Sequence, residues 1–145
     1  MRDIFVLALV LIMLGCEKDP HTPTFDYNQN AGIWVPYELV FDNGNVLTVS
    51  EDNYDYFASL FGQYVSCVRL NQDKTYHAVS WTTIENYTVT NKKGAYWYDT
   101  ESGRLIFEIG TNPTDRYSYR VVEIEGSNMI LEAEFKTLIK LRKRL

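Results

Sequence analysis

The residue with the clearest chemical potential is Cys16, which ends a short apolar run near the N-terminus. An uncharged run over residues 4–14 follows Met1-Arg2, and the small Gly15 stands directly before the cysteine. This order is typical of a signal peptide, with cleavage before a thiol that can accept diacylglycerol. The run is about half of the ~20 residues that a membrane-spanning helix needs. We therefore predict a lipoprotein signal peptide over residues 1–15 and an acylated N-terminus at Cys16.

Acylation would place the mature protein on a membrane of the cell envelope. Each buried methylene of a fatty acyl chain such as palmitate contributes about 0.8 kcal/mol, so two or three chains give a stable anchor where a single chain does not. We expect an outer-membrane location, on either the periplasmic face or the cell-surface face.

Other residue types that could carry chemistry lack the necessary spacing. His21 and His77 are far apart, and no Asp, Glu or Cys stands where it would complete a zinc site. Two acidic pairs could imitate a glycosidase dyad, namely Glu123 with Glu125 and Glu132 with Glu134. Their spacing within strand patterns favours solvent-facing charges, because carboxylates are seldom fully buried. We therefore expect no enzymatic activity, no metal and no cofactor.

The remainder of the chain has the size of one domain. Residues 16–31 hold Pro20, Pro23 and a polar Asn28-Gln29-Asn30 tract, which predict a lipid-anchored tether, and residues 32–145 predict the folded domain. With Cys16 acylated, Cys67 has no second cysteine for an intramolecular disulfide. We expect it to behave as a buried small hydrophobic residue.

The charge of the chain is unevenly distributed. The net charge is −5, and together with export this argues against a nucleic-acid partner. The C-terminal segment 136–145 is nevertheless purely basic, with Lys136, Lys140, Arg142, Lys143 and Arg144. It is either a strand whose cations pair with acidic neighbours such as Glu132 and Glu134, or a patch that binds phosphate or lipopolysaccharide. We favour the first, because one short basic segment gives a weak electrostatic footprint.

Alternation of apolar and polar residues from residue 32 onward predicts β-strands. In the first strand Val35, Tyr37, Leu39 and Phe41 are expected on one buried face, with Pro36 at an edge or a bulge. Further strands are predicted at 45–49, 64–70, 75–84, 94–98, 104–109, 117–124, 129–135 and 137–142, and a helix between residues 50 and 62. The sequence thus predicts an all-β domain of about eight antiparallel strands, closed as an up-and-down barrel with one short helix.

Several short motifs follow one another in a characteristic order. Gly32-Ile33-Trp34 opens the first strand, Arg69–Tyr76 forms a meander hairpin, Gly94–Trp97 leads to Gly103–Phe107, and Tyr119–Leu131 and Ile139–Arg142 close the chain. Together they resemble the lipocalin-like (calycin-type) outer-membrane lipoproteins of Bacteroidota. Glu17 and Asp19 also resemble the acidic signal that sends lipoproteins of that phylum to the outer face. The resemblance implies a small calycin barrel, whose mouth the helical insert at residues 50–62 could plug.

The aromatic content is the remaining functional signal, with 11 Tyr, 7 Phe and 3 Trp. In one interpretation, Trp34, Tyr76, Trp81, Tyr96 and Trp97 line a cavity for a small hydrophobic ligand or a sugar. In the other, these rings fill the barrel interior. The first describes a lipid-anchored ligand-binding protein. The second describes a non-enzymatic envelope interaction module with a packed core, whose protein or glycan partner the sequence does not identify.

Replacing Cys16 by Ser tests the predicted anchor. Because a serine hydroxyl does not accept the diacylglycerol group, the Cys16→Ser protein should move from the membrane fraction to the soluble fraction. Cell fractionation measures this, and the intact mass of the wild type should show residues 1–15 removed. A variant that stays membrane-bound, or a wild type that retains these residues, would refute the anchor.

Overall fold

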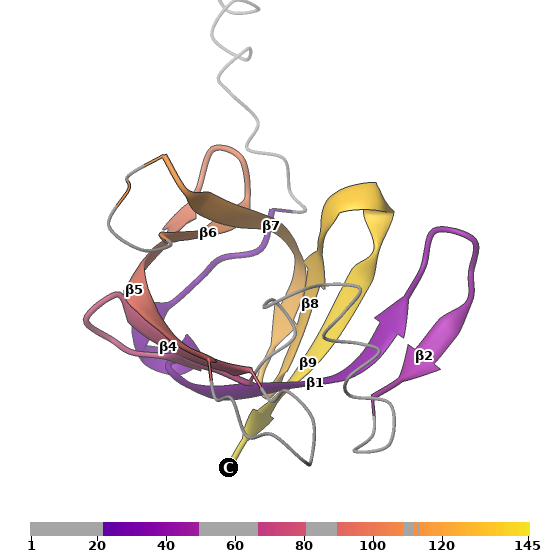
Figure 1. The fold of residues 1–145 in the computed structure, drawn as a ribbon, viewed down its shortest axis with the longest axis horizontal. Coiled ribbons are helices and arrows are strands. Elements are labelled where there is room, and N and C mark those ends of the chain that lie inside the picture. The colour runs from indigo at the N-terminus through magenta and orange to yellow at the C-terminus, as the bar shows by residue number, and fades with distance from the viewer. Residues whose placement is uncertain (1–21, 50–66, 81–89, 109–111, 113) are drawn as a thin grey trace, which may run out of the picture.

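The chain folds into one closed β-barrel (Figure 1). The computed structural model describes residues 22–49, 67–80, 90–108, 112 and 114–145. Its strands are β1 (Gly32–Val40), β2 (Val46–Thr48), β3 (Cys67–Leu70), β4 (Thr75–Ser80), β5 (Thr90–Asp99), β6 (Arg104–Glu108), β7 (Arg116–Glu125), β8 (Asn128–Glu132) and β9 (Leu138–Arg144). Neighbours pair in the order β1-β3-β4-β5-β6-β7-β8-β9, and β9 pairs back with β1.

The predicted fold class is confirmed: an all-β, eight-stranded antiparallel closed barrel with one short helix. The helix that the structure describes is α2 (Tyr27–Asn30), capped by the Asp26 carboxylate. The helix expected between residues 50 and 62 lies outside the described residues. β2 forms a hairpin with the second half of β1 through the predicted turn, in which Gly44 has φ +82°.

β1 closes the barrel and contains a bulge. Along one edge it pairs with β9, and along the other it pairs first with β3 and then with β2. Pro36 lies opposite Leu141 and Glu38 lies opposite Lys140, so Tyr37 is the extra residue. A proline has no N–H to contribute to the ladder, which makes it suited to a bulge. The prediction for Pro36 is therefore confirmed.

The bulge changes which side chains of β1 face inward. Trp34 and Pro36 are buried before it and Leu39 after it, while Val35 and Tyr37 are only partly buried. The single buried face predicted for residues 35–41 is therefore wrong in its first half. An inserted residue shifts the alternation by one and moves the side chains to the other face.

The strand predicted over residues 129–135 is correct at its start and wrong at its end. Met129 and Leu131 are buried, as expected for alternation along β8. Phe135, which alternation along the strand predicted over residues 129–135 would place on the same face, is 88% exposed and has φ 56°. β8 ends at Glu132 and a short 3-10 turn, Glu134–Lys136, precedes β9, so the strand periodicity no longer applies there.

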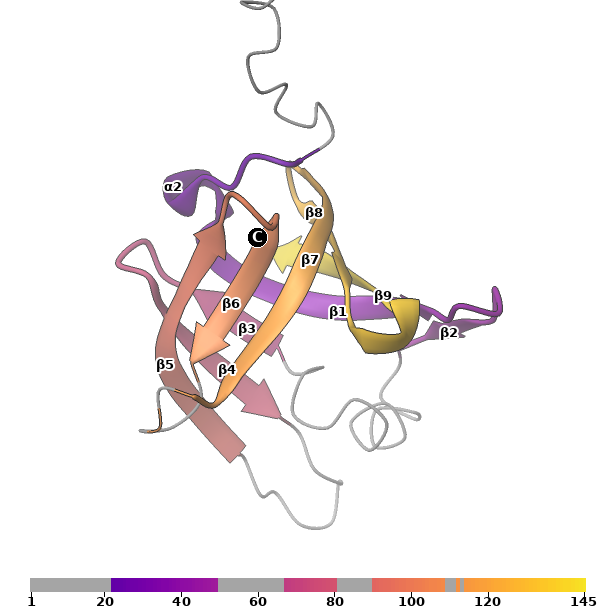
Figure 2. The same cartoon turned by 90° about the horizontal axis from the view of Figure 1, so that it is seen from above.

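The two ends of the barrel differ in construction. At one end β3, β5 and β7 finish, and short turns at residues 71–74, 100–103 and 126–127 join the strands. Residues 22–31, including α2, run across this end (Figure 2). It is termed the capped end. The opposite end is the one at which β4, β6 and β8 finish.

Candidate functional site

Aromatic side chains close the capped end. The ring of Phe25, which is 8% exposed, packs against Tyr27, Tyr96 and Tyr98 at centroid distances of 5.3, 6.2 and 5.6 Å. The Tyr98 hydroxyl donates to the Pro23 carbonyl over 2.6 Å, and the Tyr98 backbone N–H donates to the Tyr27 hydroxyl over 2.9 Å. The N-terminal segment is therefore held to β5 by both ring packing and hydrogen bonds.

This packing differs from the tether predicted over residues 16–31. The prolines and polar residues of that stretch suggested a free linker, but Phe25 and Tyr27 between them anchor residues 22–31 to the barrel. Residues 16–21, which begin with the proposed lipid attachment at Cys16, lie outside the described residues.

Lys143 of β9 fastens the cap to the closing strands. Its ammonium donates to the Gln29 carbonyl over 2.7 Å and lies 5.9 Å from the centre of the Trp34 ring. The side chain crosses Gly32, where a Cβ would lie 2.5 Å from Lys143 Cε. The Trp34 indole N–H in turn donates to the Asn30 carbonyl of α2 over 2.9 Å. The cap, β1 and β9 are thus one connected unit.

Beneath the cap, further aromatic rings cross the interior. Phe107 lies 5.0 Å from Tyr76, 6.0 Å from Tyr96 and 6.1 Å from Tyr119, centroid to centroid. The Tyr96 hydroxyl donates to the Asn71 carbonyl over 2.8 Å, and the Tyr76 hydroxyl donates to a backbone carbonyl of β6. These rings form an aromatic floor between the cap and the rest of the interior.

Burial keeps the hydroxyls of this region neutral. Desolvation raises the pKa of Tyr76, Tyr96 and Tyr98 above the ordinary tyrosine value. A raised pKa means that the protonated hydroxyl, which donates the hydrogen bonds described above, is the form that folding favours. Tyr76, Tyr96 and Tyr98 therefore act in this region as neutral hydrogen-bond donors to backbone carbonyls.

Toward the opposite end the inward-facing side chains become smaller and more accessible. On β4 the inward residue after Tyr76 is Ala78, and on β3 the inward residue before Leu70 is Val68. Tyr76 and Leu70 are 5% and 1% exposed, whereas Val68 and Ala78, which lie opposite each other, are only partly buried. Tyr117 of β7 is also partly buried there. Val68, Ala78 and Tyr117 are thus partly buried, inward-facing side chains toward the opposite end, while at the capped end Tyr27, Tyr98 and Ile124 are partly buried as well.

The structure brings together three of the predicted ligand-lining residues. Trp34, Tyr76 and Tyr96 belong to one buried core. Trp97 lies on the outer face, where the Arg116 guanidinium sits 4.9 Å above its ring. Adjacent residues of a strand point to opposite faces, so Tyr96 and Trp97 cannot line the same interior. Trp81 lies outside the described residues.

Sequence reasoning missed several residues of the site. Phe25 was assigned to the tether, and Phe107 and Tyr119 were assigned to strands without a place in the candidate set. Alternation along β6 and β7 was the signal that could have added the latter two, because Phe107 follows the buried Leu105 at an interval of two and Tyr119 precedes the buried Val121 at the same interval. Val68 and Ala78 carried no signal of their own, since small apolar residues are common on any buried strand face.

The basic C-terminal strand pairs differently from the expectation. Lys140 pairs with Glu38, and the Arg142 guanidinium lies 4.6 Å from the ring centre of Tyr37. Glu132 was expected to pair with a base of this segment. It instead accepts two hydrogen bonds from Arg120, which lower the pKa of the Glu132 carboxyl group. Electrostatic pairing on the outer face therefore follows cross-strand register and not proximity in sequence.

The part of the chain that the structure describes contains neither a cluster of metal ligands nor a membrane-spanning helix. No group of three or more His, Cys, Asp and Glu residues gathers there in a way that could hold a metal ion. None of the helices described is long and apolar enough to cross a membrane. Cys67 of β3 is partly buried, where full burial was expected.

The barrel is similar to solved structures of low sequence identity. It matches a lipocalin-like protein from Bacteroides uniformis with a TM-score of 0.56 and 14% identity, over 79% of this chain and 97% of that one. The chain has a lipocalin-like fold. An uncharacterized protein from Bacteroides eggerthii matches this lipocalin-like barrel with a TM-score of 0.55 and 13% identity, over 79% and 98% of the two chains. No protein family and no curated protein matches the sequence.

Truncating Phe25 tests whether the cap is part of the fold. Phe25→Ala should lower the free energy of unfolding by about 3–5 kcal/mol, as expected for a buried Phe. Phe135→Ala removes the same ring from an exposed position and should change it by less than about 0.5 kcal/mol. Urea unfolding of both variants measures the difference. Equal effects would show that residues 22–31 do not contribute to the stability of the barrel.

Proposed function

We propose that this protein is a lipid-anchored envelope lipoprotein whose lipocalin-like barrel binds a small hydrophobic ligand between the aromatic floor and the opposite end. The observation that carries the proposal is the change in inward-facing side chains along the barrel. Cap and floor fill the capped end, whereas Val68, Ala78 and Tyr117 face inward and are only partly buried. The protein would act as a binding protein and not as an enzyme.

The chemistry of these side chains favours an apolar ligand. Val68 and Ala78 offer methyl groups, and the Tyr117 ring offers a flat apolar surface. Phe107, which lies opposite Tyr117 across β6 and β7, would supply the base of the chamber. Ligand sites in proteins are mostly lined by such apolar and aromatic groups, with few polar groups that fix orientation.

A lipid on Cys16 would also orient the barrel. Thr22 lies at the capped end, with its Cγ2 3.4 Å from the position of a Cβ on Gly103. The stretch from Cys16 to Thr22 spans at most ~20 Å when fully extended. Anchoring at Cys16 would therefore hold the capped end close to the outer membrane, on its periplasmic or its cell-surface face. The opposite end would then be turned toward the surrounding medium, from which a ligand would enter.

A paired substitution tests the ligand chamber. Ala78 faces inward, and Ala95 of the neighbouring strand β5 faces outward. Ala78→Phe should fill the chamber and weaken binding of the neutral apolar fluorophore N-phenyl-naphthylamine by about tenfold or more, equivalent to about 1.4 kcal/mol. Ala95→Phe adds the same ring outside and should leave probe binding unchanged. Fluorescence titration gives the affinities.

The stability of the same variants separates a chamber from a filled core. If there is space beside Ala78, Ala78→Phe should leave urea unfolding nearly unchanged. If the interior is filled, the added ring should destabilise the fold by about 1–3 kcal/mol. A wild type that binds no probe, together with a destabilised Ala78→Phe variant, would refute the binding function and favour an interaction module with a packed core.

A further inference from the structure

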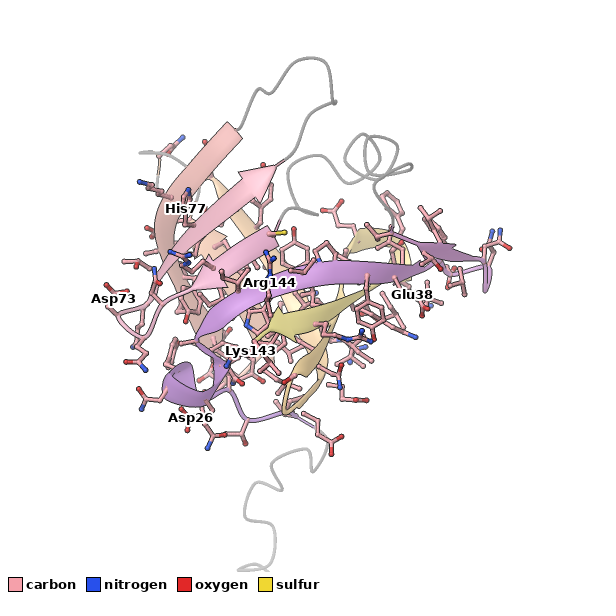
Figure 3. All side chains as sticks on the ribbon, turned by 90° about the horizontal axis from the view of Figure 1, so that it is seen from below. Asp26, Glu38, Asp73, His77, Lys143 and Arg144 are labelled. Carbon is pink, nitrogen blue, oxygen red and sulfur yellow. The ribbon has the colours of Figure 1, made fainter. Side chains whose placement is uncertain are left out.

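A row of basic residues crosses the outer face of the barrel from β9 to β5. In the antiparallel register Ile33 lies between Arg144 and Arg69, Arg69 lies opposite His77, and His77 lies opposite Lys93. Each of them is next in sequence to an inward-facing position, so the row points outward. Figure 3 shows His77 and Arg144 on the strands that lie toward the viewer.

The composition of this row departs from the rest of the outer face. Elsewhere, cross-strand partners of opposite charge form ion pairs, namely Glu38 with Lys140, Glu108 with Arg116 and Arg120 with Glu132. Among the described residues, no ion pair involves Arg69, Lys93 or Arg144. Ile33 separates Arg144 from Arg69, and His77 separates Arg69 from Lys93. The positive charges of the row therefore follow one another across the strands without a described acid between them.

One other pair of bases, Arg104 and Arg120, also faces across strands. That pair is flanked by Asp99 on β5 and Glu132 on β8, so each base has an acid on its outer side. The carboxylates of Asp99 and Glu132 thus compensate the positive charges of Arg104 and Arg120. The row from Arg144 to Lys93 contains no acid among its described members.

The central part of the row lines a groove. The groove has a volume of about 500 Å³ and is bounded by Arg69, His77 and Lys93 together with Asn71, Thr75 and Tyr76. None of the described residues that line it is acidic. The carboxylate of Asp73 accepts hydrogen bonds from the backbone and hydroxyl of Thr75 and lines a second groove on the other side of Arg69. The first groove is therefore a concave surface with basic side chains from three adjacent strands.

We propose that Arg69, His77 and Lys93 form a binding site for a phosphate group. Directly opposed residues of antiparallel strands have Cβ atoms ~5 Å apart, which lets three side chains converge on one phosphate. A guanidinium matches two phosphate oxygens at once, an ammonium adds a compact charge, and an imidazole N–H donates a further hydrogen bond. Arg144, two strand spacings or ~10 Å from Arg69, is placed to contact a second anionic group. The site is separate from the proposed chamber, and the phosphate belongs either to a lipid headgroup or to a free phosphorylated solute.

Nuclear magnetic resonance titration of the Cys16→Ser chain with inorganic phosphate tests the site. The backbone amide signals of Arg69, His77 and Lys93 should shift together, with one apparent Kd. The variant R69Q/K93Q should bind phosphate about tenfold or more weakly, because each charged hydrogen bond contributes strongly. The variant R104Q/R120Q removes the same two charges from the compensated pair and should bind like the parent. R69Q/K93Q should also unfold at an equal or higher urea concentration, since it removes two nearby charges of the same sign.

Vesicles identify the source of the phosphate. Phosphatidylcholine vesicles containing phosphatidic acid should bind the Cys16→Ser chain if the ligand is a lipid headgroup, and R69Q/K93Q should abolish this binding. Vesicles of phosphatidylcholine alone provide the blank for any binding through the apolar leader. Phosphate binding without vesicle binding would support the same site with a free solute as ligand. The proposal is overturned if phosphate shifts none of the three signals, or if both double variants lose affinity equally.

Discussion

The pairing of β1 with β9 is the constraint on which the rest of the structure depends. It joins the first and last strands of the barrel and leaves the eight-stranded ring without a free edge. β1 pairs with β9 along one edge and with β3 and then β2 along the other, and the bulge at Tyr37 shifts its register with β9 part-way along. In this register Trp34 lies opposite Lys143, and Lys143 bonds the Gln29 carbonyl of α2. Closure of the barrel and capping of its end are therefore achieved by the same pair of strands.

This coupling gives the barrel two unlike ends. Phe25 and the aromatic floor fill the capped end, and the hydroxyls of Tyr76, Tyr96 and Tyr98 donate to backbone carbonyls. A rigid base of this kind can hold a neighbouring chamber in shape without taking part in chemistry. On the outer face, cross-strand register determines which residue lies opposite each base. Arg120 lies opposite an acid, Glu132, whereas Arg69 lies opposite another basic residue, His77. The proposed sites for an apolar ligand and for a phosphate group therefore lie on separate surfaces, the first inside the barrel and the second outside.

The fold class was predictable because alternation and turn residues are local signals, and they were read correctly for most strands. Pro36 indicated an edge or a bulge but did not show how a bulge would shift the alternation, so the inward face of residues 35–37 was reversed. They also do not reveal that Phe25 returns to pack on Tyr98, a contact between residues far apart in sequence. The candidate site was predicted less well than the fold, because its residues are brought together by contacts that are distant in sequence. Trp97 was grouped with Tyr96 by residue type, and the basic row became visible only once the register placed β3, β4 and β5 side by side.

The central claim is that an apolar ligand enters the interior from the opposite end and rests above the aromatic floor. Intermolecular nuclear Overhauser effects between decanol and the methyl groups of the saturated protein test it most directly. We expect contacts from the alkyl chain to the methyl groups of Val68 and Ala78, and none to Ile33, which faces outward on β1. Contacts to Ile33 without contacts to Val68 and Ala78 would contradict the account.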